Sequence, residues 1–160
     1  MNFLEDVVIG HHSEFGSFAF TAELIKKFAT EFDPQPFHLD EEAGRRSLLG
    51  GLAASGWHVA AVAMKLRIAE SQRATAEAKA RGETVAVSGP SPGFRELRWI
   101  KPVLAGDTIS YASEVVAVRA TASKPGWGIV QARTTATNQH GDVVMTFLAT
   151  VFLPQQGNAS

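Results

Sequence analysis

Two side chains that can exchange protons, Asp33 and His38, lie within the nine-residue stretch Phe32–Asp40. Prolines at positions 34 and 36 disfavour helix in the residue before each, so Asp33 and Gln35 are expected to be extended. An imidazole exchanges protons near neutral pH. A carboxylate at a helix C-terminus lies at the negative end of the dipole, which disfavours ionisation and favours proton acceptance. The stretch predicts an acid/base pair on a stiff connector, although spacing alone fits a turn-capping Asp33 and a structural His38 better.

A second candidate site begins at Ser55-Gly56, at the front of an apolar segment. The N–H groups of a helix N-terminus have no intrahelical partner and favour a developing oxyanion. Gly56 would let a carbonyl approach its N–H without a side chain in the way. The alternative is a Ser55 helix cap followed by a glycine needed for packing. A hydrolase built on Ser55 and His58 is weakly indicated, because the G-x-S-x-G elbow is absent.

The remaining candidates are weaker. The glycines at 50–51 and 89–93 lack the Lys-Ser/Thr of a phosphate loop. His38 and Asp40 have no third metal ligand at a recognised spacing, so no metal site is expected. Trp99 is expected in the core or at an interface. The other histidines outside the two motifs lie in predicted turns and are expected to be solvated; they are His11, His12 and His140.

The elements that must position these residues follow from periodicity and turn chemistry. A helix is expected over 22–32, capped by Thr21 and stopped by Pro34, with a short helical turn after Asp40. The segment 52–66 has almost no polar face and predicts a buried helix, followed by a polar extension over 71–81 and a stop at Gly82. Strands are expected over 5–9, 14–20, 94–100, 107–118, 128–137 and 143–153, the last four as an antiparallel meander around the central helix.

Composition indicates one globular domain over residues 1–153 and a polar C-terminal tail, expected to be frayed, over 154–160. The 160 residues carry a net charge of −1 without a Lys/Arg block, so neither nucleic acid nor a membrane surface is expected as a partner. The absence of cysteine excludes disulfides and thiol catalysis. No signal peptide is visible at the N-terminus, and a cytoplasmic location is expected.

Three segments in this order resemble the MaoC-type dehydratases, a family that includes R-specific enoyl-CoA hydratases. They are Asp33-x4-His38-Leu39-Asp40, Gly50-Gly51 with Ala54-Ser55-Gly56-Trp57-His58, and Leu97-Arg98-Trp99-Ile100-Lys101-Pro102-Val103 with Gly106-Asp107. The resemblance spans essentially the whole chain. It implies an α+β hot-dog fold, in which a long central helix is wrapped by a curved antiparallel sheet. It also implies a homodimer or higher homo-oligomer with the acyl pocket near the subunit interface.

The resemblance implies roles as well. Asp33 and His38 match the pair that activates water for syn addition to a 2-enoyl thioester, giving an (R)-3-hydroxyacyl product. Gly56 matches the residue whose N–H polarises the thioester carbonyl, with Ser55 beside it at the substrate. The reaction that the resemblance implies is that of a carbon–oxygen lyase on an acyl-CoA-type substrate, with no cofactor or metal required.

The sequence departs from the strict hydratase signature at two positions. Gln35 stands where that signature has Asn, and Phe37 replaces a smaller residue. Together with Trp57 they are candidates for shaping the acyl pocket, and a branched or dicarboxylic acyl group becomes possible.

Two other functions stay open at this point. A hot-dog thioesterase would use the same Gly56 site but direct water or a carboxylate nucleophile at the carbonyl carbon. A non-catalytic acyl-thioester binder would keep the fold without turnover.

Overall fold

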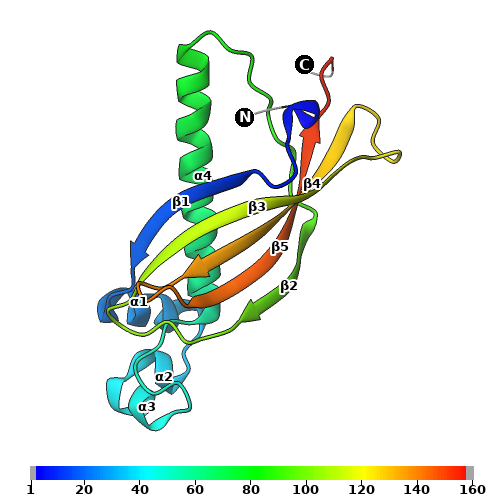
Figure 1. The fold of residues 1–160 in the computed structure, drawn as a ribbon. Helices are drawn as coiled ribbons and strands as arrows, with labels where there is room; N and C mark the ends of the chain where they lie inside the picture. Colours follow the sequence, from blue (N-terminus) through cyan, green and yellow to red (C-terminus); the bar gives the residue numbers. More distant parts are fainter. Residues whose placement is uncertain (1–2, 158–160) are drawn as a thin grey trace.

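The computed structural model describes residues 3–157, which form one five-stranded antiparallel sheet packed on a long helix (Figure 1). The strands are β1 (His12–Ala19), β2 (Gly93–Trp99), β3 (Thr108–Ala120), β4 (Trp127–Thr137) and β5 (Val143–Pro154). Their order in the sheet is β1-β3-β4-β5-β2. A curved sheet wrapped around one helix is the hot-dog arrangement that the resemblance implies, and this expectation is confirmed.

Strands β3, β4 and β5 form the expected meander, because short turns rich in Gly, Pro and Asn join them. The first of the four strands predicted for the meander, β2, does not pair with β3. It pairs antiparallel with β5 at the far edge of the sheet, so β1 and β2 are the two edge strands. Trp99, the last residue of β2, therefore lies beside Met145 of β5.

The N-terminal segment differs from the prediction. The expected strand over 5–9 is instead a short 3₁₀ helix, η1 (Leu4–Asp6), in which the Asp6 carboxylate accepts a hydrogen bond from the Phe3 N–H at 3.1 Å. Leu4 is buried with Val130 and Leu153 in a small second core cluster. Leu4 and Val7 therefore attach this turn to the sheet, whereas Val8 and Ile9 are 66% and 61% exposed.

The long helix α4 spans Gly56–Ala80. The predicted start at residue 52 is wrong, because Ala53 forms an isolated β-bridge with Leu104 and the chain stays extended as far as Ser55. The helix continues through the polar extension and ends before Gly82, whose φ is +76°. Its C-terminal half extends beyond the sheet, as Figure 1 shows, which explains why that half is polar.

The main core lies between the first half of α4 and the concave face of the sheet. Val59, Val62 and Ala63 of α4 pack there with Ile109, Tyr111, Met145 and other apolar side chains. The Tyr111 hydroxyl donates a hydrogen bond to the Val59 carbonyl at 3.2 Å. This packing fixes the N-terminal end of α4 relative to the sheet.

Besides η1, three short α-helices precede α4 in the described chain: α1 (Ala22–Phe32), α2 (Pro36–Leu39) and α3 (Glu41–Arg46). The predicted caps are confirmed, since the side chains of Thr21 and Asp40 accept hydrogen bonds from Leu24 N and Ala43 N. The apolar stripe of α1 is only partly buried. Ile25 and Ala29 are enclosed, whereas Phe32 is 68% exposed.

The described part of the tail, 154–157, is attached to the sheet end. Gln155 N donates to Gly126 O at 2.8 Å, and Gln156 N donates to the Glu5 carboxylate at 3.0 Å. The rest of the predicted tail, 158–160, lies outside the described residues. Within residues 3–157, no helix is both long and apolar enough to cross a membrane.

Candidate active site

The connector between α1 and α3 places Asp33 and His38 side by side. Asp33 is the C-cap of α1, with its N–H donating to Ala29 O at 2.9 Å, and Gln35 is extended with φ −81° and ψ 142°. The expected extended conformation is confirmed for Gln35, whereas Asp33, with φ −154° and ψ 68°, is neither helical nor extended. Pro36, however, is the first residue of the one-turn helix α2, which carries His38. This turn brings the imidazole back towards Asp33.

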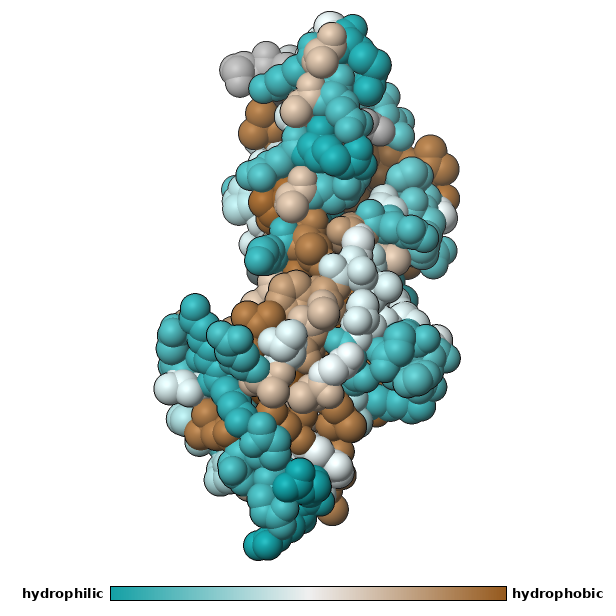
Figure 2. Space-filling model, turned by 90° about the vertical axis from the view of Figure 1, so that its left-hand side faces the viewer, coloured by the Kyte–Doolittle hydropathy of each residue, from teal (hydrophilic) through white to brown (hydrophobic). Residues whose placement is uncertain are grey.

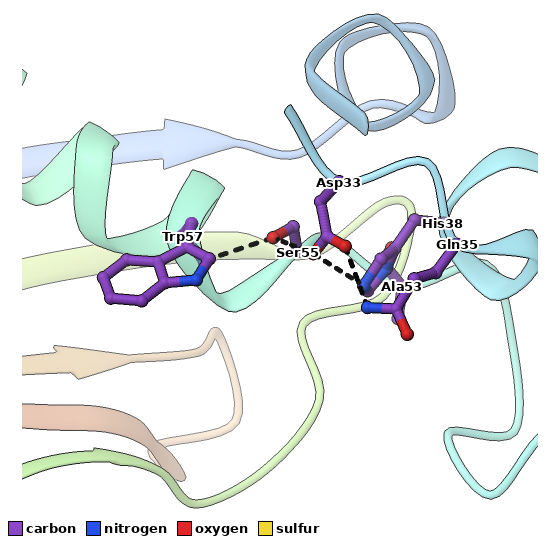
Figure 3. Close-up of polar contacts among 6 residues, drawn as sticks. All are labelled: Asp33, Gln35, His38, Ala53, Ser55 and Trp57. Carbon is purple, nitrogen blue, oxygen red and sulfur yellow. Dashed lines mark hydrogen bonds and ion pairs between the residues drawn. The ribbon is translucent and has the colours of Figure 1, made fainter. Parts of the chain in front are cut away.

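The Asp33 carboxylate is held by two neutral donors. Its Oδ2 accepts a hydrogen bond from Ser55 Oγ at 2.6 Å, and its Oδ1 accepts one from Gln35 Nε2 at 2.8 Å (Figure 3). Partial burial by itself would raise the pKa of Asp33, but the hydrogen bonds from Ser55 and Gln35 and the charge of His38 outweigh it and lower the pKa below 3.8. The net shift in the pKa of Asp33 is therefore opposite to the one expected from the helix C-terminus.

His38 is buried, and its two ring nitrogens have different surroundings. Nδ1 lies 2.7 Å from the Ala53 carbonyl oxygen, which can only accept, so Nδ1 carries a proton. Nε2 lies 3.4 Å from Asp33 Oδ2. In the neutral imidazole, Nε2 is therefore an acceptor that faces a second acceptor. The edge of Phe37 contacts the His38 ring, with the ring centroids 4.5 Å apart.

Ser55 and Gly56 form the start of α4. Ser55 is the N-cap, and its Oγ accepts a hydrogen bond from Trp57 N at 3.3 Å while donating to Asp33. Gly56 is the first residue of the helix, and its N–H makes no hydrogen bond with any residue in 3–157. One hydroxyl therefore joins the end of α1 to the beginning of α4.

Trp99 covers Gly56, an arrangement that sequence reasoning missed. A Cβ added at Gly56 would overlap the Trp99 indole, so glycine is required for this close contact. The Trp99 ring also meets Trp57 edge to face, with centroids 5.2 Å apart, and the two side chains are about half exposed. No local pattern marked Trp99 as a neighbour of Gly56, because the contact depends on the placement of β2 beside β5.

These residues line one cavity of about 460 Å³, which we name the Asp33 cavity. All seven predicted site residues are in its wall: Asp33, Gln35, Phe37, His38, Ser55, Gly56 and Trp57. Sequence reasoning had not placed Lys101, Val103 and Val144 there. Among residues 3–157, no cluster of three His, Asp or Glu side chains could hold a metal ion.

A family model described as a MaoC-like domain matches residues 7–138. The chain belongs to the MaoC-like dehydratase family. A MaoC-like dehydratase from Rhodospirillum rubrum has 36% sequence identity and a TM-score of 0.78, with 98% of this chain and 99% of that chain covered. A Mycobacterium tuberculosis protein with a double hot-dog fold has 21% identity and a TM-score of 0.75, over 99% of this chain and 46% of that one, which is a likeness of fold alone.

Among curated proteins, a mesaconyl-CoA hydratase from Cereibacter sphaeroides is 34% identical over 68 residues, which are 42% of this chain. The matched region is 20% of the length of that hydratase, and the match to a second curated relative, from Bacillus subtilis, is 48% of its length. The chain therefore matches less than half of either relative. Membership of the family supports hydratase or dehydratase activity in general. It does not extend the substrate of any one relative to this protein.

Proposed function

We propose that this protein hydrates a 2-enoyl thioester, or dehydrates the corresponding (R)-3-hydroxyacyl thioester, in the Asp33 cavity. One observation carries the proposal. Asp33 Oδ2 and His38 Nε2 lie 3.4 Å apart in the wall of a cavity that Gly56 also lines. Two hydrogen-bond acceptors in that position are suited to a molecule with two protons to donate, and the smallest is water.

In the proposed mechanism, a water molecule donates one hydrogen bond to Asp33 and one to His38 Nε2. A lone pair on the water oxygen is then directed at C3 of the enoyl group. As the C3–O bond forms, the Asp33–His38 pair takes a proton, and the alkene electrons move onto the thioester oxygen as an enolate. The Asp33–His38 pair then returns this proton to C2, which restores the thioester carbonyl and the starting state of the pair. The reverse sequence eliminates water.

Gly56 would stabilise the enolate. Its N–H is at the N-terminus of a 25-residue helix and has no acceptor among the described residues, so it is available to a thioester oxygen. Trp99 over Gly56 and Trp57 beside it would restrict the direction from which the thioester approaches.

Ser55 and Gln35 are proposed as positioning residues. Ser55 is 1% exposed, and its hydroxyl is engaged with Asp33 and Trp57 N, which favours holding the carboxylate over contact with substrate. Gln35 holds the other carboxylate oxygen, a role beyond the pocket shaping predicted for it. Phe37, Val103 and Val144 give the cavity the apolar wall that an acyl chain requires.

The test follows the loss of enoyl absorbance in a panel of 2-enoyl-CoAs of different length, branching and terminal charge. Wild-type protein is expected to turn over at least one member. Asp33→Asn and His38→Gln should each lower kcat at least ~10²-fold, because each removes a general acid/base group. Wild-type turnover of none of the panel, or full activity in both variants, would contradict the proposal.

Release of free CoA thiol is measured in parallel. Thiol release without loss of the double bond would identify a thioesterase instead. Substrate binding without any turnover would identify a non-catalytic acyl-thioester binder. No cofactor or metal is proposed in either direction of the hydration reaction.

A further inference from the structure

A second cavity of about 320 Å³ lies between α1, β1 and α4, and we name it the His58 groove. Its apolar wall consists of Phe18, Leu24, Phe28, Phe32, Ala61 and Val62. It shares no lining residue with the Asp33 cavity. Figure 2 shows that the side of the molecule with α4 and β1 carries an apolar band between two polar regions.

His58 is the unusual residue of this groove. It is 7% exposed, stacks on the Phe28 ring with centroids 4.5 Å apart, and meets Phe20 edge to face at 4.9 Å. Its Nδ1 is enclosed and has no hydrogen-bond partner among residues 3–157. An enclosed nitrogen with no acceptor beside it is a poor site for the proton, so the N–H of the neutral ring is assigned to Nε2, which has no hydrogen-bond partner among residues 3–157 either.

The protonation state of His58 limits what that partner is. Burial lowers the pKa of His58, so the ring is neutral at neutral pH and has one N–H to donate. A carboxylate oxygen, which can only accept, is a suitable partner for that N–H.

The charged residues at the rim of the groove point to the same ligand. Lys27 and Lys65 line it, and neither forms an ion pair with a residue in 3–157. By contrast, the adjacent Lys26 is paired with Glu41 at 2.7 Å. Glu31 is the one acidic side chain in the lining, so the rim carries an excess of one positive charge. Lys65 Nζ also lies 5.7 Å above the Phe18 ring, which keeps its charge close to the apolar wall.

We propose that the His58 groove binds a small amphipathic carboxylate. The aromatic or aliphatic body of the ligand packs against Phe18, Phe28 and Phe32. Its carboxylate lies between the two unpaired lysines and accepts the N–H of His58. This site is separate from the proposed hydratase chemistry and does not depend on it.

The test titrates the full chain with 3-phenylpropionate, by calorimetry and by NMR of the histidine ring protons. A ligand of this size is expected to bind with a Kd on the order of 1 mM. The matched neutral ligand, 3-phenylpropanamide, lacks the negative charge and should bind at least about tenfold more weakly. Propionate lacks the aromatic ring and should show no saturable binding. Equal binding of acid and amide, or no saturable binding of the acid, would overturn the proposal.

Variants assign the binding to the groove. Lys27→Gln and Lys65→Gln should each weaken 3-phenylpropionate binding about threefold, the scale of an exposed charge contact, and Glu31→Gln should strengthen it. Lys26→Gln makes the same charge change on the same helix outside the groove and should leave the Kd unchanged. If Lys26→Gln weakens binding as much as Lys27→Gln does, the attraction is a general charge effect and the site is refuted.

His58→Phe supplies the decisive comparison. Phenylalanine suits a site bordered by Phe20 and Phe28, so the variant should fold with an unchanged or higher Tm, yet it has no N–H for the ligand. We expect about a tenfold loss of affinity. Unchanged affinity in this variant would show that the ligand carboxylate binds outside the His58 groove, for example in the Asp33 cavity, and would refute the proposal.

Discussion

Asp33 is stabilised as an anion by side chains from two different parts of the chain. Gln35 is two residues away, whereas Ser55 is 22 residues away and donates the shorter hydrogen bond, at 2.6 Å against 2.8 Å. Both lower the pKa of Asp33. The ionised carboxylate can accept a hydrogen bond from water across the whole neutral range, as the proposed mechanism requires.

Ser55→Ala should shift the acidic limb of the pH profile of kcat/KM to higher pH. A depressed pKa means that the ionised form of Asp33 is favoured by the fold and is lost only as pH falls. Removing the Ser55 donor raises that pKa, so activity should disappear at a higher pH than in the wild type. The measurement is kcat/KM against pH with an enoyl-CoA that the wild type accepts.

Gln35→Ala serves as the comparison and should move the limb in the same direction by less, because Gln35 is exposed. Loss of the Ser55 cap should also cost about 1 kcal/mol of unfolding free energy, so all profiles are recorded well below the Tm of each variant. An acidic limb that stays in place in Ser55→Ala, or moves to lower pH, would refute the role of Ser55.

Gly56→Ala should destabilise the protein and impair catalysis, because its Cβ would overlap the Trp99 indole. We expect a loss of about 1–3 kcal/mol in unfolding free energy, typical of overpacking. The check is a double-mutant cycle with Trp99→Ala, measured by urea unfolding and by kcat. In the Trp99→Ala background, Gly56→Ala should be nearly neutral for stability. Additive losses would show that Trp99 is not the cause.

At the scale of elements, α3 and the loop after it support His38 indirectly. A Cβ at Gly44 of α3 would lie 2.5 Å from the backbone carbon and oxygen of Gly51 and 2.6 Å from Leu52 N. Ala53 follows directly, and its carbonyl holds His38 Nδ1. The contact between α3 and this loop therefore fixes the orientation of the imidazole.

Gly44→Ala should destabilise the protein by about 1–3 kcal/mol and lower kcat, although alanine favours helix over glycine by about 1 kcal/mol. The sign of the change in unfolding free energy therefore distinguishes crowding between α3 and the loop, which destabilises, from helix propensity, which stabilises. Gly51→Ala is the matched control, since its Cβ would meet only the Leu104 side chain at 3.4 Å, an ordinary contact. Urea unfolding and enoyl-CoA kinetics check both variants. If the Gly44→Ala variant is more stable than the wild type, crowding against the backbone of Gly51 is contradicted.

At the scale of the whole molecule, β2 is an edge strand with exposed apolar side chains. It pairs only with β5, and Phe94, Trp99 and the following Ile100 are each about half exposed. Edge strands of this kind recruit a further strand. The homo-oligomer implied by the family resemblance remains a prediction, and we expect a second copy of the chain to cover β2.

Phe94→Glu should therefore convert a dimer into a monomer in sedimentation velocity, because it brings two like charges together across the contact. Val87→Glu is the control, since Val87 is exposed but lies outside the strands. A monomeric wild-type protein, or a dimer that persists in Phe94→Glu, would remove β2 from the interface.

Local sequence patterns determined much of this protein. Thr21 and Pro34 bounded α1, Asp40 capped α3, and turn residues separated four strands whose bounds agree with β2–β5 within about two residues. Such signals act over a few residues and need no knowledge of the fold. The Asp33-x4-His38 spacing and the Ser55-Gly56 pair were visible for the same reason.

Only the tertiary structure decided what those residues contact. The hydrogen bond from Ser55 to Asp33, the Trp99 ring over Gly56 and the stacking of His58 on Phe28 join segments that are distant in the chain. The pKa of Asp33 is lowered by hydrogen bonds from Ser55 and Gln35 and by the charge of His38, so the direction of its shift could not be predicted from the sequence. The strand expected over 5–9 was likewise not formed, because burial of Leu4 against the sheet outweighed strand propensity.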